Sequence, residues 1–173
     1  NSCFNRNQSV SLIENWQILS PVRGKYFGVN SLNHFMHKQF RTKTIEQSAD
    51  YSNRVFPYPF GIEQIVYGDK VINIANHRRH NAWPKENSLQ YIANGEIGIV
   101  TGQTNFKFKG GKPVYLHVEF TTQKGITYTF YNSDFGEEKQ STLELAYALT
   151  VHKSQGSEFG TVFVVIPDPC FLL

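Results

Sequence analysis

The chain of 173 residues has little of what marks several protein classes. Its only cysteines are Cys3 and Cys170, one near each end, and no Cys/His cluster has zinc-finger spacing, so we expect no structural zinc. No apolar run approaches the ~20 residues that a bilayer-spanning helix needs. The first residues, NSCFNRNQSV, do not resemble a secretory signal peptide. We therefore expect a cytoplasmic protein with no membrane partner.

The chain also lacks a phosphate-binding P-loop, because G-x-x-x-x-G-K-[ST] occurs nowhere in it. The nearest candidate, Gly110-Gly111-Lys112-Pro113, has no earlier glycine at the needed spacing and no hydroxyl after the lysine. A complete ATP site needs that lysine and an acidic strand that binds Mg²⁺. We expect this chain alone to hydrolyse no ATP.

The composition is that of a globular domain, with 40% hydrophobic and 18% charged residues. The net charge of +3 permits a polyanionic partner without requiring one. The run His77-Arg78-Arg79-His80 is the one candidate metal site, but its two arginines would repel a cation. A solvated basic loop is the better interpretation, and we assign no metal site.

The stretch from Leu143 to Ile166 carries two apolar runs, LAYALTV and TVFVVI, around a polar insert. The second run has no polar break from Val162 to Ile166, which is typical of a strand covered on both faces of a mostly parallel sheet. The polar residues between the runs are Thr150, His152, Lys153, Ser154 and Gln155.

Two structures fit this stretch. If the first run is a strand and HKSQG opens a short helix, backbone N–H groups and polar side chains meet where the strand ends, which suits a phosphate. Alternatively, Ser141 to Glu144 forms a capping box and one buried helix runs to Gln155, with Gly156 as its C-cap. Periodicity alone leaves both open.

A second strand is predicted at Trp16 to Val22, where an apolar run is interrupted by Pro21. The loop RGKYFG follows, and Asn30 is a plausible N-cap. Apolar residues then recur at helical spacing, which predicts an amphipathic helix from Val29 to about Phe40 with Leu32, Met36 and Phe40 on its apolar face. This order places Arg23 at the carboxyl edge of a sheet.

The middle of the chain changes period. Residues 41–61 are polar and then rich in proline and aromatic residues, which indicates a linker. Short alternating runs separated by glycine-containing turns follow, and together they predict a small β-barrel. The predicted strands are Ile65 to Val66, Lys70 to Asn76, Glu96 to Thr101, Val114 to Thr121 and Ile126 to Tyr131.

Three segments resemble one protein family. TVHKSQGSEF is similar to motif V of superfamily 1 helicases of the RecD-like branch, and LSPVRGKYFGVNSLN is similar to their motif IV. GDKVINIAN and NGEIGIV resemble the SH3-like barrel that this family inserts between the two motifs. The resemblance implies an α/β fold: a RecA-like lobe with a mostly parallel sheet in residues 1–62 and 141–173, and an inserted SH3-like β-barrel in residues 63–140.

The resemblance also implies roles on the nucleic-acid side. Thr150 and His152 would contact backbone phosphates of a single strand, with Lys153, Ser154 and Gln155 supporting that surface. Hydroxyl, imidazole and amide groups hold phosphate without distinguishing bases.

On the nucleotide side, the resemblance implies that Gly156 and Glu158 face ATP, the glycine by close backbone approach and the carboxylate as an acceptor for ribose hydroxyls. Arg23 would offset charge on the terminal phosphates as an arginine finger does. We expect Arg23 to lie near Glu158, because loops that follow parallel strands gather at one edge of a sheet.

The function implied is the second motor lobe of a larger ATP-dependent DNA helicase that continues beyond both ends of this chain. Its cofactors would be ATP and Mg²⁺. Its partners would be single-stranded DNA, with RNA equally compatible with the sequence, the N-terminal motor lobe, and candidate nuclease–helicase subunits. The alternative is a non-catalytic module that binds nucleic acid or protein and retains a helicase-like scaffold.

Overall fold

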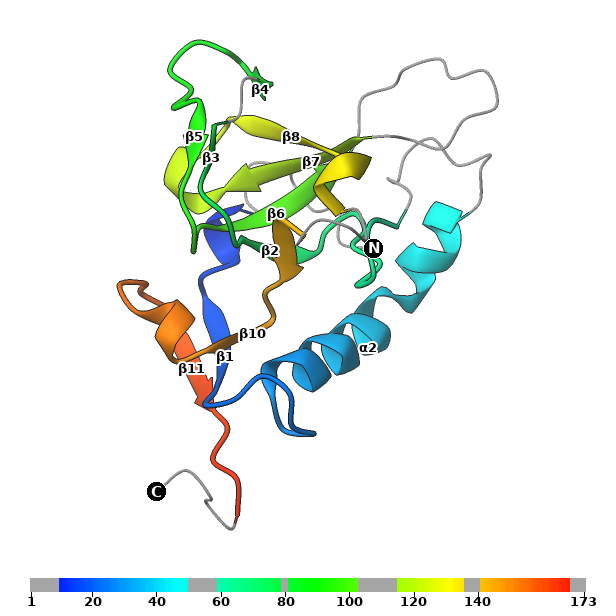
Figure 1. Ribbon diagram of the computed structural model, residues 1–173, viewed down its shortest axis with the longest axis vertical. Helices are drawn as coiled ribbons and strands as arrows, with labels where there is room; N and C mark the ends of the chain where they lie inside the picture. Colours follow the sequence, from blue (N-terminus) through cyan, green and yellow to red (C-terminus); the bar gives the residue numbers. More distant parts are fainter. Residues whose placement is uncertain (1–9, 50–58, 79–80, 103–114, 136–140, 169–173) are drawn as a thin grey trace.

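The computed structural model describes residues 10–49, 59–78, 81–102, 115–135 and 141–168. Within them, a three-stranded parallel sheet and the helix α2 (Val29–Ala49) lie on one side of the molecule, and a six-stranded antiparallel sheet lies on the other (Figure 1). A third, two-stranded sheet pairs β3 (His77–Arg78) with β5 (Tyr91–Ile92). The mixed α/β class predicted from the sequence is confirmed.

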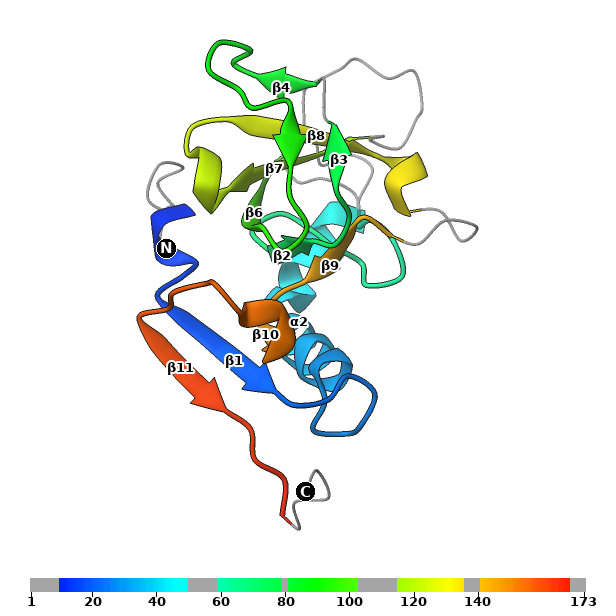
Figure 2. The same ribbon diagram turned by 60° about the vertical axis from the view of Figure 1, so that its left-hand side comes forward.

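In the parallel sheet, β1 (Trp16–Ser20) lies between β10 (Ala148–Thr150) and β11 (Thr161–Val164) (Figure 2). Both neighbours run parallel to β1, so the three strands end at the same edge. A three-residue 3₁₀ turn, η3 (His152–Ser154), follows β10 directly. The strand at Trp16 is therefore confirmed, and a strand followed by a short helical turn replaces the alternative of one long buried helix.

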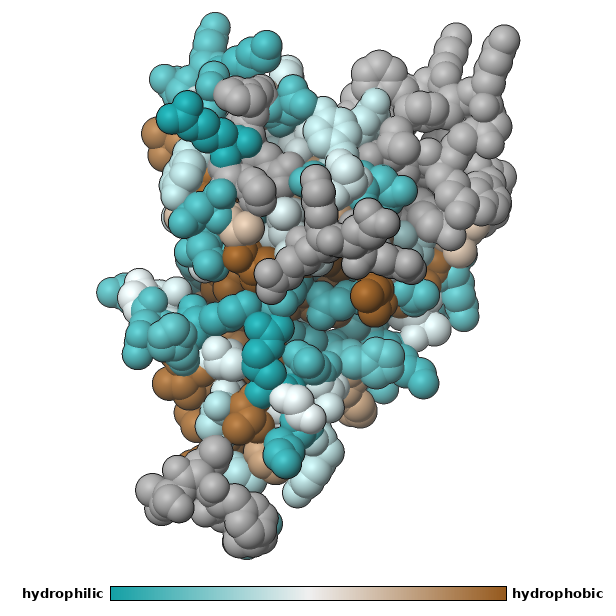
Figure 3. All heavy atoms as spheres, viewed as in Figure 1, coloured by the Kyte–Doolittle hydropathy of each residue, from teal (hydrophilic) through white to brown (hydrophobic). Residues whose placement is uncertain are grey.

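The prediction that the run TVFVVI is covered on both faces is wrong within the described residues. Val162, Phe163 and Val164 are 43%, 56% and 58% exposed. β11 is an edge strand that pairs only with β1 in the described sheet, and an apolar sequence does not by itself supply a layer to cover it. Figure 3 shows hydrophobic residues at the surface in this lower part of the molecule.

α2 begins at Val29 as predicted, but it continues to Ala49, so the linker assigned to residues 41–61 is wrong for its first part. Residues 50–58 lie outside the described residues. The predicted apolar face is also only partly buried, since Phe40 is 64% exposed. Among the described residues, no helix combines the length and apolarity needed to cross a membrane.

The helix instead turns polar residues inward, at positions four apart from Val29. Asn33 is 3% exposed, and its Nδ2 donates to the backbone oxygens of Leu145 (2.8 Å) and Ala148 (3.2 Å). Its Oδ1 accepts from the Ala148 backbone N–H at 2.7 Å. Asn33 thereby fixes the short segment that leaves one sheet and enters the other.

The large sheet has the order β4-β8-β7-β6-β2-β9. Four of the predicted barrel strands are present, with somewhat different ends. The prediction of a closed barrel is not met among the described residues, because β4 and β9 remain as the two edges of an open sheet. Ile65 makes only an isolated bridge with Phe60. The strands are β2 (Lys70–Asn73), β4 (Ala82–Trp83), β6 (Ile97–Gly102), β7 (Tyr115–Phe120), β8 (Thr127–Tyr131) and β9 (Leu143–Leu145). The short 3₁₀ turns η1 (Thr121–Gln123) and η2 (Asn132–Phe135) follow β7 and β8.

The two sheets share buried contacts. Ile72 of β2 and Ile99 of β6 pack in one apolar cluster with Leu149 of β10. Lys70 Nζ donates to the Trp16 backbone oxygen at 2.9 Å and lies 5.2 Å from the centre of the Trp16 ring. Burial lowers the pKa of Lys70 to about 8. The antiparallel sheet is therefore packed against the parallel one rather than tethered loosely to it.

A buried carboxylate completes this junction. Asp69, fully buried, accepts from the Tyr147 hydroxyl (2.7 Å) and the Val66 backbone N–H (2.7 Å), and its oxygens lie 2.9 Å from His37 Nε2 and 3.3 Å from Arg41 Nε. We call these residues the Asp69 network. It joins α2, the start of β2 and the segment before β10.

Candidate nucleic-acid and nucleotide site

The loop after β10 presents two of the five predicted nucleic-acid residues fully to solvent and the others in part. Thr150 ends the strand, and its Oγ1 accepts from the Lys153 backbone N–H at 3.2 Å. His152 and Gln155 are exposed, whereas Lys153 and Ser154 are half-buried. The short helical turn that the sequence suggested after this strand is present as the three-residue turn η3.

Gly156 closes the turn. Its φ of +82° lies in the left-handed region, which residues with a side chain adopt at a cost, and the described atoms leave open space around it. Glu158, two residues later, is exposed. A ligand can therefore approach the backbone of Gly156 closely.

Arg23 lies in the loop after β1, at the same edge of the sheet as η3. The loop folds back on the start of α2, where the backbone N–H of Asn30 donates to the Arg23 oxygen at 3.1 Å. Ser20 Oγ donates to the Phe27 oxygen at 2.9 Å and holds the base of the loop. The Arg23 side chain is 44% exposed, so its guanidinium is accessible to a ligand.

The two loops converge on Glu144, in β9. Arg23 Nη2 lies 2.8 Å from Glu144 Oε2, and Lys153 Nζ lies 3.1 Å from the same oxygen. The structure therefore brings together two predicted site residues that are far apart in sequence, through a carboxylate whose role the sequence did not suggest.

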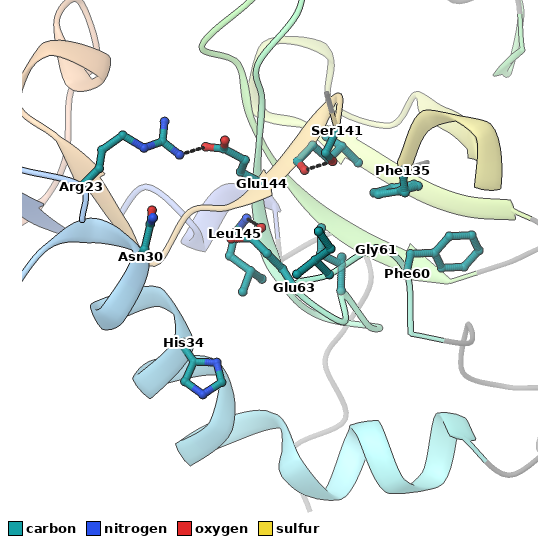
Figure 4. A pocket seen from close by; sticks show the side chains of 13 residues that line it. Arg23, Asn30, His34, Phe60, Gly61, Glu63, Phe135, Ser141, Glu144 and Leu145 are labelled. Carbon is teal, nitrogen blue, oxygen red and sulfur yellow. Dashed lines mark hydrogen bonds and ion pairs between the residues drawn. The ribbon is translucent and has the colours of Figure 1, made fainter. Parts of the chain in front are cut away.

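Two open clefts flank this triad. The first, of about 550 Å³, opens between the start of α2 and β9, and Figure 4 shows Arg23 and Glu144 pointing toward each other and Glu63 beside Leu145. The second, of about 690 Å³, separates the η3 loop from the antiparallel sheet. Arg23 lines the first, whereas Gly156 and Glu158 line the second. The polar residues of the second cleft are Glu14, Asn94, Glu96, Thr121, Thr122, His152, Lys153, Gln155, Ser157 and Glu158.

Glu63 is the titratable group of the first cleft with a displaced pKa. Burial, together with the neighbouring charge of Glu144, raises the pKa of this carboxyl from 4.5 to about 7. The Leu145 backbone N–H donates to Glu63 Oε2 at 2.7 Å and opposes the shift. No sequence pattern marks this group, because Glu63 is a single glutamate in an irregular segment.

Glu63 should make folding stability depend on pH. The folded state binds the Glu63 proton more tightly than the unfolded state does. The contribution of this carboxyl to the unfolding free energy should therefore be complete below pH 4.5 and should be lost as the pH rises towards 7. The Glu63→Gln chain should thus gain up to about 3 kcal/mol over the unchanged chain at pH 8 and little at pH 4. Urea unfolding at both pH values measures this. Glu46→Gln, at an exposed position of α2, is the control and should track the unchanged chain. Parallel pH profiles for the Glu63→Gln and unchanged chains would contradict the prediction.

Gly28 is needed for the Arg23 loop. A Cβ added to Gly28 would lie 2.7 Å from the Arg23 carbonyl carbon, whereas one added to Gly24 in the same loop would meet no atom within 4 Å. Gly28→Ala should cost about 1–3 kcal/mol of unfolding free energy because the backbone must shift. Gly24→Ala should change it by less than about 0.5 kcal/mol. Denaturant unfolding of both variants checks the prediction, and equal effects would contradict it.

Comparison with known proteins bears on the loop after β10. Residues 145–172 match the UvrD-like helicase C-terminal domain. This match covers the end of β9, β10, the η3 loop and β11, which include every predicted site residue except Arg23. It supports assignment to the C-terminal region of superfamily 1 helicases.

Longer but weaker similarities cover nearly the whole chain. It is 26% identical over 164 residues to the RecBCD enzyme subunit RecD of Buchnera aphidicola (subsp. Schizaphis graminum), which is 95% of this chain and 22% of that protein. The corresponding subunit from the Acyrthosiphon pisum subspecies is 26% identical over 92% of this chain and 21% of its own length. An uncharacterized protein of Methanocaldococcus jannaschii is 30% identical over 87% of this chain and 12% of its own length. The chain thus spans about a fifth of the RecD relatives.

Proposed function

We propose that this chain belongs to the second motor lobe of a RecD-like, ATP-dependent DNA helicase. The observation that carries the proposal is the meeting of two loops at one sheet edge: the Arg23 loop and the η3 loop follow adjacent parallel strands and share Glu144. Ligands of open parallel sheets bind at the carboxyl ends of the strands. The similarity to the UvrD-like domain and to RecD supports the same assignment.

On the nucleotide side, two separate groups of residues would contribute to an ATP site, Arg23 at the first cleft and Gly156 with Glu158 at the second. Arg23 is exposed and is held by a single carboxylate, so its guanidinium is free to offset charge on terminal phosphates. Gly156 leaves open backbone beside Glu158, which would accept from ribose hydroxyls. ATP and Mg²⁺ would supply the phosphoryl group and its charge neutralisation, with the P-loop lysine and metal ligands coming from another part of the longer protein.

On the strand side, Thr150 and His152 would contact backbone phosphates, supported by Lys153, Ser154 and Gln155. All but Thr150 lie in one loop, and His152 is exposed. In the same proposal, residues 63–140 form an inserted SH3-like unit, and β9 (Leu143–Leu145) of the following segment extends its antiparallel sheet by pairing with β2. The other partners would be the first motor lobe and nuclease–helicase subunits, in the cytoplasm.

A binding measurement on this chain tests the strand side. The chain should bind oligodeoxythymidylate weakly and with affinity that falls as salt rises, because phosphate contacts release counterions. His152→Ala should weaken binding about three- to tenfold, the worth of one hydrogen bond to phosphate. The loss should be equal on oligodeoxyadenylate, since phosphate contacts carry no base preference.

His34→Ala is the matched control, because His34 is also an exposed histidine but lines the first cleft. It should leave strand affinity unchanged. If His152→Ala altered the preference between the two oligonucleotides and left overall affinity unchanged, the phosphate role would be wrong.

A further inference from the structure

We infer that Glu144 is a positioning residue that makes the nucleotide side and the strand side compete for one carboxylate oxygen. This inference rests on the proposed function and adds to it a residue that the sequence did not mark. It starts from the two ion pairs on Glu144 Oε2, 2.8 Å from Arg23 Nη2 and 3.1 Å from Lys153 Nζ.

The geometry explains why the sharing matters. Glu144 lies in β9 of the antiparallel sheet, whereas its two partners extend from loops after β1 and β10 of the parallel sheet. The three side chains are 22%, 44% and 25% exposed for Glu144, Arg23 and Lys153, so each is accessible enough to exchange partners. Both ion pairs use Oε2, so each cation weakens the attraction of Glu144 for the other.

The consequence is an antagonism between two ligands. A nucleotide phosphate that draws Arg23 away leaves Glu144 entirely to Lys153, which then becomes less available to a strand phosphate. A strand phosphate that draws Lys153 away leaves Glu144 entirely to Arg23. By linkage the two effects are equal in size. For partly exposed ion pairs, each should amount to a factor of about two to five.

The test uses the longer protein that contains this chain, with a labelled oligodeoxythymidylate and a non-hydrolysable ATP analogue. Glu144→Gln should raise strand affinity about two- to fivefold without the analogue, because Lys153 is released. In the unchanged protein the analogue should raise the Kd for the strand. Glu144→Gln should reduce that increase by a similar factor, because the shared carboxylate that couples the two sites is gone. In a Lys153→Gln background, Glu144→Gln should no longer change strand affinity.

Glu46→Gln removes a carboxylate from an exposed position of α2 and is the matched control, expected to change neither quantity. A purely structural role for Glu144 would lower strand affinity in both backgrounds, which would overturn the inference. An unchanged ratio in the Glu144→Gln protein would overturn it as well. Failure of the unchanged protein to bind the strand would refute the proposed function itself, and so is distinguishable from failure of this inference.

Discussion

Replacing Asp69 with asparagine should lower the unfolding free energy of this chain by about 3–5 kcal/mol, the cost of breaking a buried charge pair. Asp69 is fully buried and accepts from Tyr147 and Val66, with His37 and Arg41 beside it. An amide in its place leaves the Arg41 charge without its counterion and turns an N–H group towards donors. Urea unfolding monitored by circular dichroism measures the loss.

Asp168→Asn is the control for that experiment, because Asp168 is exposed and should contribute less than about 0.5 kcal/mol. Equal effects of the two substitutions would show that the Asp69 network does not hold the two sheets together.

Tyr147→Phe removes one donor and keeps the carboxylate, so its cost should be smaller, about 1–3 kcal/mol for a lost buried hydrogen bond.

Replacing Arg23 with alanine should lower kcat for ATP hydrolysis by about 10³-fold in the longer protein, as loss of an arginine finger does. The charge it offsets develops in the transition state, so kcat and kcat/KM should fall together. Because Glu144 then pairs with Lys153 alone, strand affinity without nucleotide should fall, but by no more than about fivefold. Steady-state hydrolysis and strand titration of the same preparation give both values.

Lys25→Ala is the matched control, because Lys25 lies in the same loop, is exposed, and carries the same charge. It should hydrolyse ATP at close to the unchanged rate. Normal turnover by the Arg23→Ala protein would exclude a phosphate-facing role for Arg23, whatever its effect on strand binding.

Local pattern predicted those parts of the fold whose residues are apolar at a regular spacing. The strand at Trp16, the helix start at Val29 and the alternating runs of the antiparallel sheet were found in this way. The residues that α2 buries depend instead on the elements packed against it. α2 buries Asn33 and His37 and exposes Phe40, because polar side chains are needed where the chain passes between two sheets.

The continuous run LELAYALT is divided between two sheets, and its periodicity does not indicate this division. Leu143–Leu145 pairs antiparallel with β2, whereas Ala148–Thr150 pairs parallel with β1. Glu144 matched a capping box in the sequence and turned out to be an ion-pair partner of Arg23 and Lys153. The Arg23–Glu144 pair joins residues 121 positions apart, and such a contact leaves no trace in local spacing.

The candidate site was predicted residue by residue only through the resemblance to helicase motifs. Arg23 and the η3 loop do lie at one sheet edge, as strand order implied. The two clefts divide the predicted nucleotide residues, with Arg23 in one and Gly156 and Glu158 in the other. Glu144 lines the first cleft and its partner Lys153 lines the second, a division that local sequence spacing does not specify.

ATP hydrolysis by the longer protein, measured with and without single-stranded DNA, tests the central proposal most directly. A motor lobe that holds a strand at the η3 loop and a phosphate at Arg23 should couple the two. We predict hydrolysis that rises severalfold on adding oligodeoxythymidylate and that the Arg23→Ala substitution suppresses. Hydrolysis that is absent, or that is the same with and without the strand, would contradict the assignment to a helicase motor.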